Sequence, residues 1–223
     1  MTDPASSLSD ATLDELRLAL APDVAANAAF DGWGEAAIAA AAAARGVDPG
    51  VAALAYPGGA IDMIDAWFAW VDVAMAEALP MDALAGMKIR ARISALVEAR
   101  LDLIAPDREA LRRALAILAL PTNLLRAGRL GWRAADVMWR RAGDTAVDYN
   151  HYTKRTLLAA IYAATIQVFV DDDSDGQTDT RAFLARRIEG IMAFERMKSG
   201  LLARTERRPS LSRFIGRLRY PAA

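Results

Sequence analysis

The sequence predicts an all-α protein, and three observations support that prediction. The chain contains 50 alanines among 223 residues, and alanine is the strongest helix former because it loses no side-chain rotamer entropy in a helix. Apolar residues recur at helical spacing, and strand-like alternation persists nowhere in the sequence. Groups of glycine and proline separate these segments. About ten helices joined by short turns follow from these patterns.

Each predicted helix ends at a helix-breaking residue or turn. Pro22 follows the first helix, Gly32 begins the second, and the turn over residues 46–48 precedes a short third helix. Later breaks lie at residues 57–59, 80, 106, 121, 143–144 and 171–176. The predicted helices therefore cover residues 10–20, 32–45, 49–56, 59–79, 83–104, 107–119, 121–142, 148–171, 178–204 and 209–219.

Residues 32–56 have the outline of a helix-turn-helix without the side chains that read DNA. The second short helix, PGVAALAY, contains no Lys, Arg, Asn or Gln, although contacts to phosphates and base edges need such donors. Residues 1–87 carry two basic and thirteen acidic side chains, a net charge that repels the duplex. We therefore predict a vestigial helix-turn-helix and no nucleic-acid partner.

The longest apolar stretch, residues 157–170, is 14 residues long, whereas a helix needs roughly 20 to span a bilayer. It is predicted to be a helix that is covered on both sides. Its own domain covers one side, and a second copy of the chain or an apolar ligand covers the other. The simpler alternative is that the helix belongs to the hydrophobic core of a single chain. The amino terminus lacks the pattern of a signal or transit peptide. A cytoplasmic, bacterial location is the simplest expectation.

The chain has no cysteine and one histidine, which excludes a cysteine nucleophile and a histidine-rich metal cage. The segment from Asp171 resembles the first half of a calcium loop, but its twelfth position is Ala182 where a bidentate glutamate is required. We predict a solvated turn with Asp175 or Asp179 capping the next helix. No metal, no cofactor and no enzymatic activity are expected.

The segment from Gly143 to Arg155 combines a break with a dense polar and aromatic helix start. Asp148, Tyr152 and Arg155 share one helical face. Asp148 and His151 could ligate a metal, but a dimetal carboxylate site needs two such pairs and further acids. Because tyrosine and arginine are common anchors of interfaces, this face predicts protein recognition.

The carboxy-terminal segment has the pattern of an amphipathic helix on an anionic membrane surface. The apolar residues Leu211, Phe214, Ile215 and Leu218 share a face, with Arg213 and Arg217 opposite. Docking of this apolar face on the protein itself is the alternative.

Three sequence segments resemble the Coq-nine family of ubiquinone-biosynthesis proteins. They are RALAILALPTN from Arg113, DVMWRRAGDTAVDYNHYTKRTLLAAIY from Asp136, and the DT..FL..R pattern from Asp179. The resemblance runs from about Leu13 to Glu195 and is strongest after Glu98. It implies a TetR-like helical bundle that has lost DNA binding, a homodimer, and binding of lipids that include isoprenoid quinone intermediates.

The resemblance further implies a protein that is not an enzyme but presents its lipid to a dimetal-carboxylate demethoxyubiquinone hydroxylase. The implied hydroxylase contacts are Asp136, Met138, Asp148, His151, Tyr152 and Arg155, with His151 standing where family members often have tryptophan. An apolar chamber between the helices predicted at 107–119, 121–142 and 148–171 is expected to hold the lipid. Its expected lining residues are Leu118, Trp139, Leu157 and Ile161.

Three parts of the chain follow from this interpretation. Residues 1–58 form the vestigial helix-turn-helix module, residues 59–204 the ligand-binding and dimerisation domain, and residues 205–223 a linker and the membrane-associating helix. The expected location is the cytoplasmic face of a bacterial inner membrane. Two alternatives remain, a TetR-type ligand-sensing transcriptional regulator and a helical structural subunit without a ligand.

Overall fold

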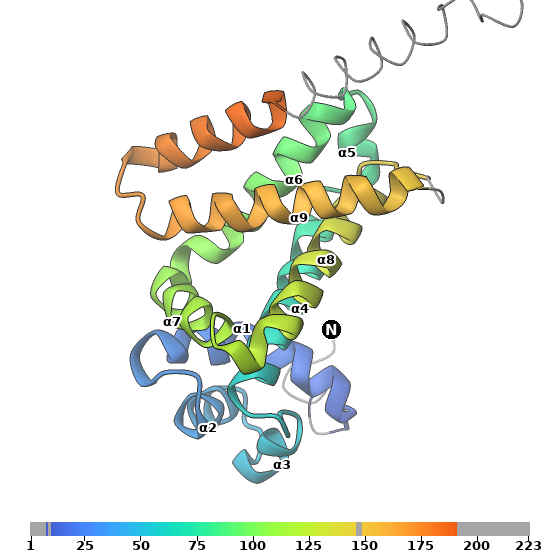
Figure 1. Ribbon diagram of the computed structural model, residues 1–223. Helices are drawn as coiled ribbons and strands as arrows, with labels where there is room; N and C mark the ends of the chain where they lie inside the picture. The colour runs from blue at the N-terminus through green and yellow to red at the C-terminus, as the bar shows by residue number, and fades with distance from the viewer. Residues whose placement is uncertain (1–7, 9, 146–148, 191–223) are drawn as a thin grey trace, which may run out of the picture. The chain divides into compact units, whose positions relative to one another are not determined.

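The computed structural model describes residue 8, residues 10–145 and residues 149–190. These residues form α-helices and short 3-10 turns, and no strand occurs among them (Figure 1). The predicted all-α class is therefore confirmed. The predicted helix over residues 209–219, and with it all six proposed membrane-binding residues, lies outside the described part of the chain.

The first three helices are α1 (Leu13–Asp31), α2 (Glu35–Ala44) and α3 (Pro49–Leu54). Thr12 and Glu15 form a capping box at the start of α1, and Asp48 accepts a hydrogen bond from Val51 N (3.0 Å) at the start of α3. Such caps satisfy amide groups that have no partner within the helix. Helices α2 and α3 thus keep the helix-turn-helix arrangement that the sequence predicted.

Helix α1 continues through Pro22, where the sequence predicted that the first helix would end before this residue. An interior proline costs about 3 kcal/mol because it removes a hydrogen bond and crowds the preceding turn. Leu16, Leu20 and Val24 are fully buried on the inner face of α1. Burying such side chains contributes roughly 1.5–3 kcal/mol each, so packing on both sides of the proline exceeds its local cost.

Helix α4 (Ala60–Ala78) is followed by a short α5 (Met81–Ala85) and by α6 (Ile89–Ile104). The single helix predicted over residues 83–104 is therefore wrong, since the chain turns between α5 and α6. Arg92 explains the break. Its guanidinium donates to the carbonyl oxygens of Ala85 (2.9 Å) and Met87 (2.9 Å), which replaces bonds that a continuous helix would supply, and to that of Ala142 (2.9 Å).

The remaining elements are η1 (Ala105–Asp107), α7 (Arg108–Leu118), η2 (Pro121–Asn123), α8 (Leu124–Arg141), α9 (Tyr149–Val170) and η3 (Asp175–Gln177), followed by a helix described over residues 178–190. At the start of that helix, Asp172 accepts hydrogen bonds from Thr180 N (2.8 Å) and Ser174 N (2.9 Å). Ser174 Oγ accepts from Asp179 N (3.1 Å). Asp172 and Ser174 therefore take the capping role predicted for Asp175 or Asp179.

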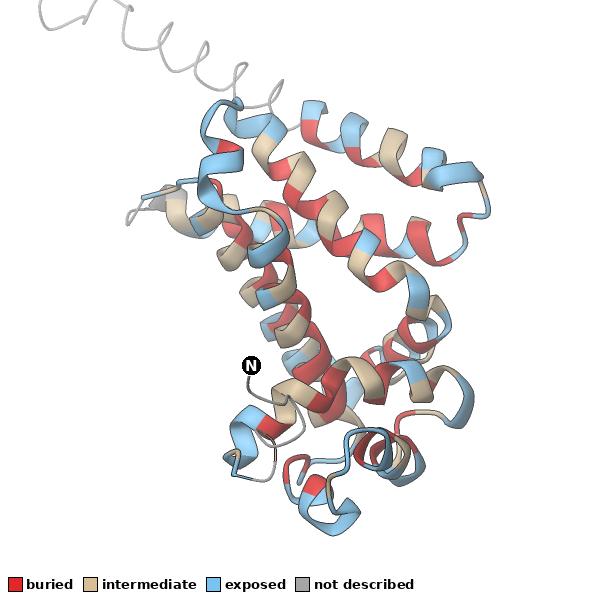
Figure 2. Cartoon of the chain, turned by 180° about the vertical axis from the view of Figure 1, so that it is seen from behind, coloured by how far each residue is buried: buried red, intermediate tan, exposed pale blue. Residues whose placement is uncertain are grey.

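The core surrounds α4, which packs on α1, α6 and α8. Trp67 of α4 is fully buried and lies 5.5 Å from the ring of Trp33 and 5.5 Å from the ring of Phe68. Trp33 Nε1 donates to Ala110 O (3.0 Å), which connects the segment before α2 to α7. The buried residues form a continuous band along α4 (Figure 2).

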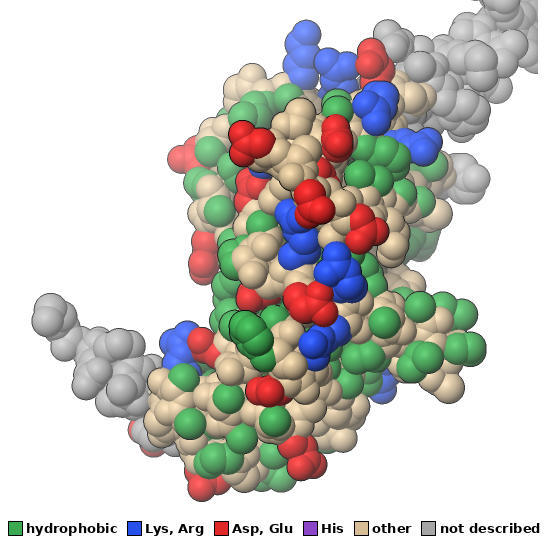
Figure 3. Space-filling view, turned by 90° about the vertical axis from the view of Figure 1, so that its left-hand side faces the viewer, with side chains coloured by type: hydrophobic (Ala, Val, Ile, Leu, Met, Phe, Trp, Pro, Cys, Tyr) green, Lys and Arg blue, Asp and Glu red, His purple; other side chains and the backbone are tan. Residues whose placement is uncertain are grey.

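The outer side of α6, α7 and the turn after α9 is covered by paired charges. Acidic and basic side chains lie next to one another on this side (Figure 3). Arg112 pairs with Glu109 (2.7 Å) and Asp171 (3.3 Å), and Arg181 pairs with Glu98 (2.9 Å) and Asp102 (2.7 Å). Exposed pairs of this kind contribute about 0–1 kcal/mol each. They therefore keep this surface solvated and add little to the stability of the fold.

The described residues up to Leu184 belong to one compact unit, and a second unit begins at Ala185. Helix α1 packs on α2 and on α4, across the boundary predicted at residue 58. The three-part division of the chain stays a prediction. Among the described helices, none combines the length and apolar character that a bilayer crossing needs.

Candidate functional site

Helices α8 and α9 pack against one another and position most of the residues predicted to bind a partner (Figure 1). Arg155 of α9 is 2% exposed. Its guanidinium contacts Asp136 Oδ1 of α8 (2.6 Å) and Asp144 Oδ2 of the connecting turn (3.1 Å), and donates to His151 O (3.2 Å). A buried charge needs such partners, so Arg155 joins three parts of the chain at this site.

Two further cations complete the ion pairs around Arg155. Arg140 contacts Asp136 Oδ2 (2.8 Å), and Lys154 contacts Asp144 Oδ1 (2.7 Å). Lys154 also lies over the ring of Trp139 (5.4 Å), whose Nε1 donates to Lys154 O (3.0 Å). Losing one partner of a buried pair leaves an uncompensated charge, which is strongly destabilising. These contacts therefore fix the first turns of α9 against the end of α8.

An aromatic cluster of Trp132, His151 and Tyr152 lies beside these ion pairs. The Tyr152 ring is 5.1 Å from His151 and 6.0 Å from Trp132, and Trp132 is 6.5 Å from His151. Tyr152 is 61% exposed. Exposed tyrosine beside other aromatic rings is enriched at protein interfaces.

The structure divides the six predicted contact residues into different environments. Of the five that the structure describes, Met138 is fully buried, Arg155 is nearly so, Asp136 and His151 are partly buried, and only Tyr152 is well exposed. Asp148 lies outside the described residues. Sequence reasoning missed Trp132, Asp144 and Lys154. Trp132 precedes Asp136 by one helical turn, and this spacing was the signal that could have included it.

The four residues predicted to line a lipid chamber lie on the three expected helices. Leu118 of α7 and Ile161 of α9 are buried, whereas Trp139 of α8 and Leu157 of α9 are partly exposed. Trp139 contacts Lys154 twice, through its ring and through its Nε1, and so helps α8 to pack on α9. A chamber among these residues stays a prediction.

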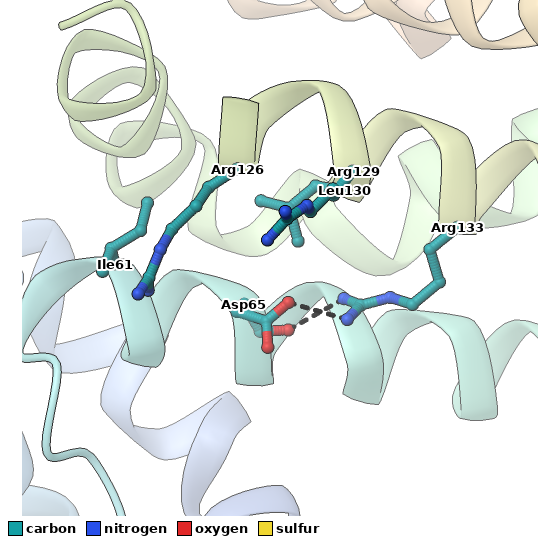
Figure 4. Close-up of a pocket in the computed structure, with 6 residues that line it drawn as sticks. All are labelled: Ile61, Asp65, Arg126, Arg129, Leu130 and Arg133. Atoms are coloured by element: carbon teal, nitrogen blue, oxygen red, sulfur yellow. Dashed lines mark hydrogen bonds and ion pairs between the residues drawn. The ribbon is translucent and has the colours of Figure 1, made fainter. Parts of the chain in front are cut away.

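A pocket of about 400 Å³ lies between α4 and α8. Three arginines of α8 reach it from one side, and Asp65 of α4 faces them (Figure 4). Leu130 and Ile61 supply its apolar surface. Arg133 binds Asp65 (2.7 Å) and also Asp72 Oδ2 (3.1 Å), whose other oxygen binds the buried Arg100. Sequence reasoning did not predict this pocket, because it depends on which faces of two distant helices meet.

The helix-turn-helix outline carries no free basic side chain in the described structure. Arg45, at the end of α2, contacts Asp23 of α1 (2.7 Å). The exposed side chains of α3 include Val51 and Leu54, which are apolar. Such a surface offers no donors to phosphates or base edges. Within the described residues, no group of three or more His, Asp or Glu side chains is arranged to hold a metal ion.

The arrangement of helices defines the fold. A TetR transcriptional regulator from Nitrosomonas europaea has a similar crystal structure, with a TM-score of 0.61 and 23% sequence identity over 77% of this chain and 95% of that one. At this identity the likeness concerns the fold alone. The chain thus has a TetR-like helical fold, as the family resemblance implied.

The family resemblance is confirmed over the part of the chain that holds the aromatic cluster. Residues 125–195 match the family model COQ9. The human and rat proteins named ubiquinone biosynthesis protein COQ9, mitochondrial, are each 43% identical over 96 residues, which is 43% of this chain. The Drosophila melanogaster protein of that name is 26% identical over 202 residues, 89% of this chain. The chain resembles the COQ9 family most closely in α8, α9 and the segment after them.

The matches cover only part of these relatives. The matched region is 30% of the human protein, 31% of the rat protein and 62% of the Drosophila protein.

Proposed function

We propose that this chain acts in ubiquinone biosynthesis as a non-enzymatic, lipid-binding accessory protein. The observation that carries the proposal is the COQ9 match over residues 125–195, which includes the whole Trp132, His151 and Tyr152 cluster. The relatives that match this region are named for ubiquinone biosynthesis. The chain's own part is to bind an isoprenoid quinone intermediate and present it, leaving ring hydroxylation to a partner.

The aromatic cluster is the surface proposed to bind the demethoxyubiquinone hydroxylase. Tyr152 offers its ring to the partner, and Trp132 and His151 hold that ring in place. Arg155 and Met138 are too buried to contact a partner directly. Their part in the proposal is to position Tyr152, because Arg155 fixes the turn of α9 that carries it. Asp136 acts in the same way through Arg155.

The lipid is proposed to lie among apolar side chains of α7, α8 and α9 that include Leu118, Trp139, Leu157 and Ile161. It would reach them from the bilayer through the amphipathic segment at residues 209–219. The proposed location is the cytoplasmic face of a bacterial inner membrane. The apolar side chains suit this lipid because an isoprenoid chain has no hydrogen-bonding group and binds by packing against hydrocarbon.

A homodimer is part of the proposal, and α9 supplies its face. The buried side of α9 packs within its own chain through Leu158, Tyr162 and Phe169. The opposite side is exposed and carries small or uncharged side chains at Thr156, Ala160, Ala163 and Gln167. Helices approach closely where side chains are small. This side of α9 is therefore the proposed contact between two copies.

Substitution of Tyr152 tests the hydroxylase surface. The Tyr152→Ala variant should weaken binding to the hydroxylase of the same organism by at least about tenfold, the usual size of losing a buried aromatic anchor. Binding is measured by biolayer interferometry with both purified proteins. Lipid carried by the variant, measured by native mass spectrometry, should remain unchanged.

Phe30→Ala is the matched control for this test. Phe30 is 83% exposed on α1, outside the COQ9 match, so removing its ring deletes an exposed aromatic of similar size. The control should bind the hydroxylase as tightly as the unmodified chain. Equal affinity of all three proteins would remove the aromatic cluster from the proposal.

A TetR-type transcriptional regulator is the other function considered. The likeness to the Nitrosomonas europaea regulator concerns the fold, and the surface that would meet DNA is apolar or acidic. The only basic residue of the helix-turn-helix outline is already paired with Asp23. A protein that binds DNA gains most of its affinity by neutralising phosphates. These observations favour the accessory function.

A further inference from the structure

The pocket between α4 and α8 lies within a group of ion pairs that join four helices, α1, α4, α6 and α8. Three aspartates of α4 project toward arginines from three other helices. Arg17 of α1 contacts Asp65 (3.0 Å) and Asp62 (3.8 Å), Arg126 contacts Asp62 (3.0 Å), and Arg133 contacts Asp65 (2.7 Å). The carboxylates are therefore shared between several cations.

Cations exceed anions in this charged cluster. Its members are Arg17, Arg100, Arg126, Arg129 and Arg133 against Asp62, Asp65 and Asp72. Five arginines and three aspartates leave two positive charges in excess. Arg129 forms no ion pair with any side chain of the described structure, yet it lines the pocket. An excess of this size beside a concave surface attracts anions.

We propose that the α4–α8 pocket binds the phosphate group of a small ligand. A guanidinium presents a planar fork of N–H donors that matches phosphate oxygens. A phosphate monoester carries about −1.5 to −2 charges at neutral pH, which balances the excess of two, whereas a carboxylate would balance only half. Asp65 lines the same pocket, but Arg17 and Arg133 already neutralise it. Arg129 and Arg126 lie one turn apart on α8 (Figure 4), and Arg129 forms no ion pair in the described structure, whereas Arg126 contacts Asp62 through one guanidinium nitrogen.

An exposed apolar corner precedes the pocket on the same helix. Leu120, Leu124 and Leu125 are 51%, 56% and 81% exposed at the turn between α7 and α8. Leu125 lies four residues before Arg129, so both side chains share one face of α8. A phosphate attached to a hydrocarbon chain could therefore contact both. The phosphate can come from such a lipid or from a soluble phosphate, and the two sources are separable by experiment.

The site is tested by isothermal titration calorimetry of the full chain with two probes, at constant ionic strength and pH 8. The probes are inorganic phosphate and dihexanoyl phosphatidic acid below its micelle concentration, and acetate is the anion control. We expect saturable phosphate binding that Arg129→Gln weakens by about tenfold, the usual size for one charge-assisted hydrogen bond. Arg90→Gln is the matched control, since Arg90 is an exposed arginine in the first turn of α6 and does not line the pocket.

The outcomes are distinct. Binding of inorganic phosphate that Arg129→Gln weakens supports the site with a soluble ligand. Binding of the lipid alone, weakened by both Arg129→Gln and Leu125→Ser, supports the site with a lipid ligand. Equal binding of acetate, equal effects of Arg129→Gln and Arg90→Gln, or no binding of either probe would overturn the proposal. The site goes beyond the proposed accessory function, and Arg129→Gln should leave hydroxylase binding unchanged, so either proposal can fail without the other.

Discussion

Arg155 illustrates how a residue can be recognised from the sequence while its role is not. Helical spacing predicted that it shares one face of its helix with Tyr152 and contacts a partner protein, but Arg155 is 2% exposed and Tyr152 61%. Spacing cannot reveal that Asp136 and Asp144 approach it from two other segments, because those contacts depend on how α8 and α9 pack. The residue predicted as an interface contact is thus held inside the chain. Tyr152, three positions earlier, is the one with an exposed side chain.

Asp172 is a second residue whose environment only the fold reveals. Burial raises the pKa of its carboxyl, but hydrogen bonds from Ser174 and Thr180 outweigh that effect and hold the pKa well below its ordinary value. A carboxyl with a lowered native pKa stabilises the fold fully above the unfolded value of about 3.9 and loses that contribution as the pH falls toward the native value. The turn after α9 should therefore weaken in acid.

The Asp172→Asn variant measures this contribution. At pH 7 it should lower the free energy of unfolding by roughly 1 kcal/mol or more, because charged acceptors are lost from several hydrogen bonds. The difference from the unmodified chain should shrink below about pH 4, where Asp172 itself becomes protonated when the chain unfolds. Urea unfolding followed by circular dichroism at pH 7 and pH 3 provides both numbers.

Asp173→Asn is the control for the acid test. The Asp173 side chain is fully exposed, and its distance to Arg108 is 3.8 Å. Its substitution should change stability little at either pH. A constant difference between Asp172→Asn and the unmodified chain from pH 7 to pH 3 would contradict the role assigned to the Asp172 charge.

At the scale of helices, periodicity located most elements but not all of their ends. The predicted helices over 107–119, 121–142 and 148–171 agree with α7, α8 and α9 within a few residues, because strong periodicity and a clear break coincide there. Pro22 did not end α1, since burial on both sides of it outweighed a local rule. The turn between α5 and α6 depends on Arg92 reaching three carbonyl groups, which no local pattern contains.

The candidate site shows the same division. Tyr152, Arg155 and Asp136 could be named from the sequence because they share one turn or belong to a recognisable motif. The α4–α8 pocket could not be named, since Asp65 and Arg133 are far apart in the sequence and only the packing of the two helices makes them neighbours. Contacts within one helix could be predicted from the sequence, whereas ion pairs between helices could not.

Helix α9 carries the prediction at this scale. An Ala163→Glu substitution places a charge in the middle of its exposed small-residue side and should convert the proposed homodimer to a monomer. Two copies would bring the two charges together without partners, which costs several kcal/mol at a close interface. Light scattering during size-exclusion chromatography measures the mass of the particle.

Ala39→Glu is the matched substitution on α2, where Ala39 is also exposed. It should leave the mass of the particle unchanged. An Ala163→Glu variant that remains a dimer would place the contact between copies elsewhere, and a monomeric unmodified chain would exclude the homodimer.

Across the whole molecule, charge is distributed unevenly along the chain. Residues 1–87 carry two basic and thirteen acidic side chains, whereas residues 196–223 carry eight basic side chains and one acidic. An acidic end is repelled by polyanions and a basic end is attracted to them. The exception inside the acidic half is the side of α4 at Asp62, Asp65 and Asp72, where arginines from other helices reverse the sign locally. The membrane is therefore expected to meet the carboxy-terminal end.

Deleting residues 209–223 tests that expectation for the chain as a whole. The deletion removes the apolar face of Leu211, Phe214, Ile215 and Leu218 together with Arg213 and Arg217, and it should abolish flotation with vesicles of phosphatidylcholine and phosphatidylglycerol.

Salt separates the electrostatic and the apolar contributions to membrane binding. Each arginine near an anionic surface contributes on the order of 1 kcal/mol, and this electrostatic contribution weakens with salt, whereas the apolar contribution does not. Flotation of the full chain should accordingly fall between 50 mM and 500 mM salt, on the scale set by the Debye length, without disappearing. The double variant Arg213→Gln with Arg217→Gln keeps the apolar face but removes two of the eight basic side chains of residues 196–223. It should float less than the full chain and lose less of its flotation between 50 mM and 500 mM salt. Unchanged flotation of the chain that lacks residues 209–223 would place the membrane contact on another surface. The exposed apolar corner at Leu120, Leu124 and Leu125 would be the next surface to test, through Leu125→Ser.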